Sequence, residues 1–309
     1  MTILRQFTFV LSAAVLGGCA AERQPGDLFG PHETGVPVVD GFLLVGQPLP
    51  DLFVRRSADP AEEYRLETVS VNDAEVILST GVAEYHYQPD PDSAGRYLPP
   101  PGKPLVAPLT LYRLHVQLSG GDQVHGKTHT PAQLRIEEAV LLDDAELTPK
   151  RSLALFAEGG EVFIEPRNQI EYLDGILEVA FSPVSGTAAY QLAVFSLDLE
   201  SEFIIDADFL EKDDSEDFER RGSSPPLEIA DGRARLPWFA IAYAGRHVMH
   251  VYGLDANWYD LVRTMPEGEF FGGLAGDSFQ RPLFRLQGGI GLFGSASVDS
   301  VGFVILPRP

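Results

Sequence analysis

Two histidine pairs are the first candidates for metal chemistry in this sequence. His125 and His129 have the H-x-x-x-H spacing that places two imidazoles on one face of a helix. The residues around them predict a strand instead, and along a strand four residues advance about 13 Å. Because zinc holds each nitrogen at about 2 Å, these two rings cannot easily share one ion. His247 and His250 fall on opposite faces of a predicted strand, since side chains alternate there. We therefore expect strand histidines and no metal site.

The densest acidic run, residues 206–219, is the second candidate for metal chemistry. Asp206 and Asp208 have the spacing that opens an EF-hand calcium loop. The third ligand position is Leu210, and Glu211 stands where such a loop needs glycine. The run is therefore predicted to be a solvated loop. A calcium-stabilised surface adhesin remains an alternative function that rests on this run alone.

Catalytic motifs are the next class to consider. Residues 288–294 are glycine-rich, but no Lys-Ser or Lys-Thr pair follows them, so they predict closely packed β backbone and not a phosphate loop. The sequence contains no Gly-x-Ser-x-Gly nucleophile elbow. Paired carboxylates for glycoside chemistry stay open, because 45 acidic residues always allow some pair. We predict no catalytic residue and no cofactor; an exported glycan or peptide hydrolase with its site at the domain junction is the alternative.

Aromatic residues are the best candidates for ligand contact. Trp238 is followed by a phenylalanine, and Trp258 and Tyr259 are adjacent. Such rings can form a platform for a sugar or a peptide. The competing interpretation is that they pack in the core of a β domain, where large aromatic side chains are common.

The elements that would position these residues are predominantly strands. The chain has 309 residues with 44% hydrophobic residues, which is enough for two packed domains. Residues 36–135 predict an immunoglobulin-like antiparallel sandwich, whose clearest strand alternates buried and exposed residues over 111–118. Residues 136–309 predict a second β-sandwich or barrel-like domain with one short helix at 255–265, for which Asp255 is the N-cap. Strands do not alternate with long helices, so the fold class is all-β and mainly antiparallel.

The charge of the chain limits its partners. The formal net charge is −22. Affinity for nucleic acid comes largely from Lys and Arg, so nucleic acid is excluded as a partner. Anionic lipid would be repelled as well, so attachment to a membrane requires another anchor. We interpret the acidity as a source of solubility at a crowded surface.

The N-terminus supplies such an anchor. Residues 1–18 contain Arg5 and a short apolar run, which is the pattern of a secretory signal. They end in Leu-Gly-Gly before Cys19, the only cysteine, and this resembles the lipobox of bacterial lipoproteins. That resemblance implies a lipid on Cys19, and residues 19–35 would be a lipidated flexible tether. Ala20, where Asp would redirect sorting, resembles the default signal for the outer membrane; which of its faces carries the protein stays open.

Five segments resemble a family of Gram-negative surface lipoproteins that is classed as a domain of unknown function. They are residues 38–42, 71–76, 111–116, 126–131 and 288–294. The resemblance implies a transthyretin-like or carboxypeptidase-regulatory-like N-terminal sandwich. It also implies genes that lie beside those for TonB-dependent outer-membrane receptors. We therefore expect an outer-membrane-anchored, non-catalytic binding or accessory component that works with such a receptor or with the cell envelope.

Overall fold

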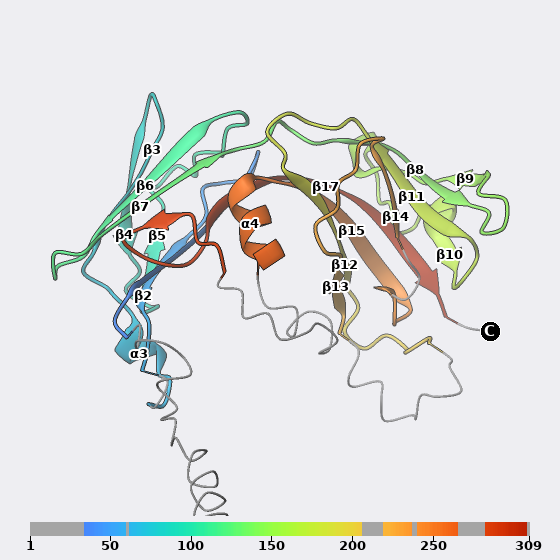
Figure 1. Ribbon diagram of the computed structural model, residues 1–309. Coiled ribbons are helices and arrows are strands. Elements are labelled where there is room, and N and C mark those ends of the chain that lie inside the picture. Colours follow the sequence, from blue (N-terminus) through green and yellow to red (C-terminus); the bar gives the residue numbers. More distant parts are fainter. Residues whose placement is uncertain (1–33, 60–61, 206–218, 237–239, 265–281, 308–309) are drawn as a thin grey trace, which may run out of the picture.

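The computed structural model describes residues 34–59, 62–205, 219–236, 240–264 and 282–307 (Figure 1). The predicted all-β class is confirmed, because the described chain consists mainly of antiparallel strands with one short helix of more than two turns, α4 (Ala256–Thr264). The other helical pieces are a single turn each: α3 (Leu66–Val69), η1 (Phe156–Glu158) and η2 (Pro166–Asn168).

The N-terminal strands follow one another around a shared hydrophobic core. Their bounds are β1 (Pro37–Leu44), β2 (Leu52–Arg56), β3 (Glu75–Ser79), β4 (Glu84–Pro89), β5 (Arg96–Leu98), β6 (Leu111–Gln117) and β7 (Gln123–His129), and they pair in the order β1-β2-β5-β4-β3-β6-β7. In β6 the side chains of Tyr112, Leu114 and Val116 are buried in this core. The alternation predicted for residues 111–118 is therefore confirmed.

The chain returns to this N-terminal unit near its end. β16 (Leu286–Gln287) pairs with β7, and the backbone that follows hydrogen-bonds to β1, where Ile290 N donates to the carbonyl of Pro37 at 2.9 Å. A Cβ added at Gly289 would lie 2.8 Å from the carbonyl oxygen of Pro37, and one added at Gly291 would lie 2.3 Å from that of Val39. The prediction of closely packed β backbone over residues 288–294 is confirmed.

The C-terminal strands form two facing layers. One layer contains β12 (Ala189–Ser196), β13 (Arg221–Ser223), β15 (Gly245–Leu254), β17 (Phe293–Leu306) and β10 (Gln169–Glu171), in the order β13-β12-β15-β17, with β10 also beside β17. The other contains β8 (Ile136–Leu142), β9 (Pro149–Ser152), β11 (Ile176–Phe181) and β14 (Arg233–Leu236), in the order β14-β11-β8-β9. Apolar side chains from both layers make up a second core.

Strand β17 belongs to both halves of the molecule. Its first residues run parallel to β1, with Phe293 beside Gly41, and its later residues pair antiparallel with β15. Phe293 packs in the N-terminal core and Phe303 in the C-terminal core. Figure 1 shows the resulting arch, with α4 under the part of β17 where the halves meet. The division of the chain at residue 135 stays a prediction, and so does the transthyretin-like classification.

Candidate functional site

Helix α4 is positioned at the junction of the two halves by the residue that precedes it. Asp255 is only 3% exposed. Its Oδ1 accepts a hydrogen bond from the backbone N–H of Trp258 at 2.9 Å, which is the N-cap role predicted from the sequence. Its Oδ2 accepts a hydrogen bond from the hydroxyl of Thr128 on β7, and Thr128 also contacts the hydroxyl of Ser295 on β17 at 2.7 Å. The cap therefore joins β7, β17 and α4.

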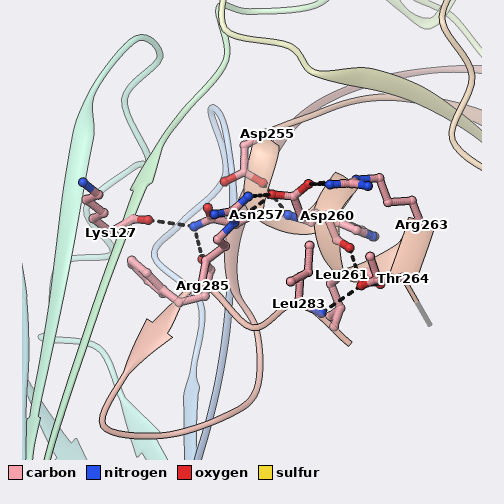
Figure 2. A network of polar contacts seen from close by, with 11 residues as sticks. Lys127, Asp255, Asn257, Asp260, Leu261, Arg263, Thr264, Leu283 and Arg285 are labelled. Carbon is pink, nitrogen blue, oxygen red and sulfur yellow. Dashed lines mark hydrogen bonds and ion pairs between the residues drawn. The ribbon is translucent and has the colours of Figure 1, made fainter. Parts of the chain in front are cut away.

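The first turn of the helix also contacts both strands, through a side chain that binds their backbone carbonyls. The side-chain amide of Asn257 donates to the carbonyl of Lys127 at 2.7 Å and to that of Phe293 at 2.8 Å (Figure 2). One side chain thus satisfies two carbonyls, one on each of two strands. This contact holds α4 against both β7 and β17.

An ion-pair network fixes the other end of α4. Asp260 is buried and accepts hydrogen bonds from two guanidinium groups, from Arg263 at 2.6 Å and from Arg285 (Figure 2). Burial raises the pKa of the Asp260 carboxyl, but the hydrogen bonds and charges of the two arginines outweigh burial, so this pKa lies below its usual range. Thr264 at the end of the helix accepts a hydrogen bond from the backbone N–H of Leu283 at 2.8 Å.

Five aromatic rings form a row across the junction, which we name the aromatic row: Phe42, Trp258, Tyr252, His250 and Phe195. Successive ring centroids lie 3.8 Å apart for Phe42 and Trp258, 6.1 Å for Trp258 and Tyr252, 5.7 Å for Tyr252 and His250, and 5.1 Å for His250 and Phe195. The rings come from β1, α4, β15 and β12, and each is half-buried. The row therefore presents partly exposed ring surface from both halves of the molecule.

The three predicted ligand-contact residues do not lie together at one described site. Trp258 lies in the aromatic row. Tyr259 lies beneath the guanidinium of Arg263, 5.5 Å from it, and does not contribute to the row. Trp238, the lipidation residue Cys19 and the acidic run except Glu219 lie outside the described residues.

The predicted histidines occupy strands. His125 and His129 are exposed on β7, and His247 and His250 face opposite sides of β15, where His247 is buried against Phe303. Sequence reasoning missed the partner of His125. In the β6–β7 register His115 stands directly opposite His125, and their Nδ1 atoms are 3.2 Å apart.

A signal for that pair was present in the sequence. The turn around residues 118–122 sets the register of the β6–β7 hairpin, and it places residues at equal distances from the turn opposite each other.

Burial lowers the pKa of both His247 and His250, which favours their neutral forms.

The side chains at this junction are suited to noncovalent contact with a ligand or a partner. Of its carboxylates, Asp255 is used as a helix cap and Asp260 as the partner of two arginines. Over the described ranges, no group of three or more His, Cys, Asp or Glu side chains is arranged to hold a metal ion. The same part of the chain contains no helix that is long and apolar enough to cross a membrane. What the aromatic row can do is stack against a ring or bury apolar surface.

Comparisons with known proteins add no relative. No protein-family model matches the chain, and no curated protein matches it.

Proposed function

We propose that this chain is an outer-membrane-anchored lipoprotein that acts as a non-catalytic binding component, with a TonB-dependent receptor as its partner. The lipobox-like residues before Cys19 support the anchor. The resemblance of the strand segments to receptor-associated lipoproteins supports the partner. The aromatic row supports the mode of action, because Trp and Tyr are enriched where proteins bury surface against each other.

The aromatic row is the observation on which the binding role rests. Within the row, Trp258 is the ring that links the two halves, because it contacts Phe42 of β1 and Tyr252 of β15. Aromatic residues that anchor an interface typically carry about 2 kcal/mol or more of its binding free energy. Replacing Trp258 should therefore weaken the complex by more than tenfold, since about 1.4 kcal/mol corresponds to a factor of ten.

Affinity purification from native outer membranes tests the proposal. The wild-type chain, Trp258→Ala and Tyr64→Ala would be compared, because Tyr64 is 61% exposed and lies outside the row. We expect a receptor barrel to accompany the wild type and Tyr64→Ala in stoichiometric amount, and to be lost with Trp258→Ala. Recovery of the wild-type chain without a receptor, or equal recovery of receptor with all three chains, would refute the proposal.

The anchor has a separate test. Cys19→Ser removes the only thiol of the chain, so it should abolish lipid labelling and release the protein from the membrane pellet. A Cys19→Ser chain that is still labelled and still sediments would exclude the lipobox interpretation without bearing on the aromatic row.

A further inference from the structure

Outward-facing side chains of β6, β7 and β16 line a cleft of about 650 Å³ on the N-terminal sheet. The β6–β7 register puts Arg113 opposite Lys127 and His115 opposite His125, and β16 places Gln287 opposite His125. Arg285, just before β16, lines the same cleft. Leu114, Gly126 and Ser79 of β3 complete its lining.

The charge of this cleft is the reverse of that of the chain. The sequence has 45 acidic and 23 basic residues. The residues that line the cleft nevertheless include three permanent cations, Arg113, Lys127 and Arg285, and no carboxylate. A surface that followed the composition would place about two acidic residues beside every basic one.

The two facing cations lack the carboxylate partners that several other described cations of the chain have. Arg56 pairs with Asp122 at 2.7 Å, and Lys150 with Asp174 at 2.5 Å. For Arg113 and Lys127 no ion pair with a described carboxylate occurs. Like charges directly opposite each other on antiparallel strands destabilise the pairing. The repulsion between Arg113 and Lys127 therefore destabilises the pairing of β6 and β7, and a bound anion would relieve it.

The neighbouring carboxylates do not neutralise the cleft. Asp260 pairs with Arg285, but it also pairs with Arg263, so one negative charge serves two guanidinium groups. The Arg285 side chain remains 54% exposed. Glu84 of β4 lies beyond Ser79 in the sheet and is 3.9 Å from His86. A net positive charge therefore remains in the cleft.

The histidine pair adds hydrogen-bonding groups to the lining of the cleft. With their Nδ1 atoms 3.2 Å apart, His115 and His125 share one hydrogen bond, so one ring donates and the other accepts through an unprotonated nitrogen. The neutral ring that accepts at Nδ1 carries its hydrogen on Nε2, which is therefore a further donor.

We propose that this cleft binds a phosphorylated polar ligand of the size of a sugar phosphate. Guanidinium, ammonium and imidazole donors from β6, from β7 and from the residue just before β16 match the several oxygens of a phosphate monoester better than the two of a carboxylate. The cleft volume lies within the range of small-molecule sites and exceeds what an inorganic ion fills. The phosphate can come from a free sugar phosphate or from a phosphorylated lipid headgroup. This site is separate from the aromatic row and does not depend on the receptor.

Titration of the full chain in detergent with soluble probes tests the proposal. The probes are glucose 1-phosphate, glucose as the uncharged control, and dihexanoyl phosphatidic acid as the headgroup. Arg113→Gln/Lys127→Gln removes the facing cations, and Lys103→Gln/Arg135→Gln is matched in charge and exposed outside the cleft. We expect the first variant to bind the preferred phosphate probe at least about tenfold more weakly, as the loss of charge-assisted hydrogen bonds requires. The control variant should bind as the wild type does.

The histidine resonances give a second readout that needs no variant. Phosphate binding should shift the ring signals of His115 and His125 in the wild-type chain and leave those of His247, buried in the other half, unchanged. Stronger binding of glucose 1-phosphate would identify a sugar phosphate, and stronger binding of phosphatidic acid a lipid headgroup; either supports the site. No binding of either phosphate probe, equal binding of glucose, or full affinity in Arg113→Gln/Lys127→Gln would overturn it.

Discussion

Asp255 shows how one residue combines burial with a structural role at the junction. Burial raises the pKa of its carboxyl, and the hydrogen bonds from Thr128 and from the N–H of Trp258 oppose this only in part. A carboxyl whose pKa is higher in the folded than in the unfolded chain stabilises the fold in its protonated form. That stabilisation is present below the unfolded pKa and is lost as the pH rises through the folded pKa.

Asp255→Asn should remove this pH dependence while keeping the helix cap. The amide oxygen can accept the hydrogen bond of Trp258 N–H, and its N–H₂ can donate to the hydroxyl oxygen of Thr128 or Ser295. Relative to Asp255→Asn, the wild-type free energy of unfolding should fall as the pH is raised from about 4 to about 8. Asp255→Ala, which has neither the titrating carboxyl nor the cap, should be about 1–2 kcal/mol less stable than Asp255→Asn at every pH. Urea unfolding of the three chains measures this, and equal losses in both variants would contradict it.

At the scale of elements, the turn between β16 and β17 carries the chain from β7 back to β1. Gly288 opens this turn with a φ of +80°, and a Cβ there would lie 2.0 Å from the carbonyl oxygen of Gln123. Backbone cannot move aside as a flexible side chain can. Gly121 in the β6–β7 turn has a φ of +96° but nothing within 4 Å of the Cβ position. A side chain at Gly121 would therefore meet only the strain of a positive φ, whereas one at Gly288 would also collide with neighbouring backbone.

Gly288→Ala and Gly121→Ala form a matched pair for this turn. Gly121→Ala should cost about 1 kcal/mol, the strain of a positive φ alone. Gly288→Ala should cost at least about 2 kcal/mol more, because the added methyl also collides with the backbone of β7. Denaturant unfolding of both variants provides the comparison. Similar losses in the two would mean that residues 288–292 do not pack against β7 and β1 as described.

The elements that were predictable from the sequence are those whose signals are local. The alternation of β6 and the cap of α4 by Asp255 follow from residues within one element. The pairing of Gly41 with Phe293 does not, because a parallel contact between distant segments leaves no periodic mark on either. The cleft was missed for a related reason: Arg113, Lys127 and Arg285 look unremarkable singly and gather only through strand register.

For the molecule as a whole, β17 is the element that both cores share. Phe293 and Phe303 are both essentially buried, one in each core, on the same strand. If one core unfolds, β17 loses packing on that side, and the other core depends on the same strand. The junction contacts of Asp255 and Asn257 link β7 to that strand as well. We therefore expect the two halves to unfold together.

Phe293→Ala and Phe303→Ala test this coupling. Each should lower the free energy of unfolding by about 3–5 kcal/mol, since each empties a packed core position. In both variants the two halves should still unfold in one common transition. Hydrogen exchange of peptides from β6 in one half and from β15 in the other would monitor it. Two separate transitions, with Phe293→Ala affecting only β6 and Phe303→Ala only β15, would show that the halves are independent.

The binding role is the central claim, and photocrosslinking in intact native cells tests it most directly. A photoreactive residue would replace Tyr252 in the aromatic row, with a second chain carrying it at the exposed Tyr64 as control. Mass spectrometry should identify a TonB-dependent receptor crosslinked to position 252 and none at position 64. No receptor at position 252, or the same products from both positions, would contradict the claim.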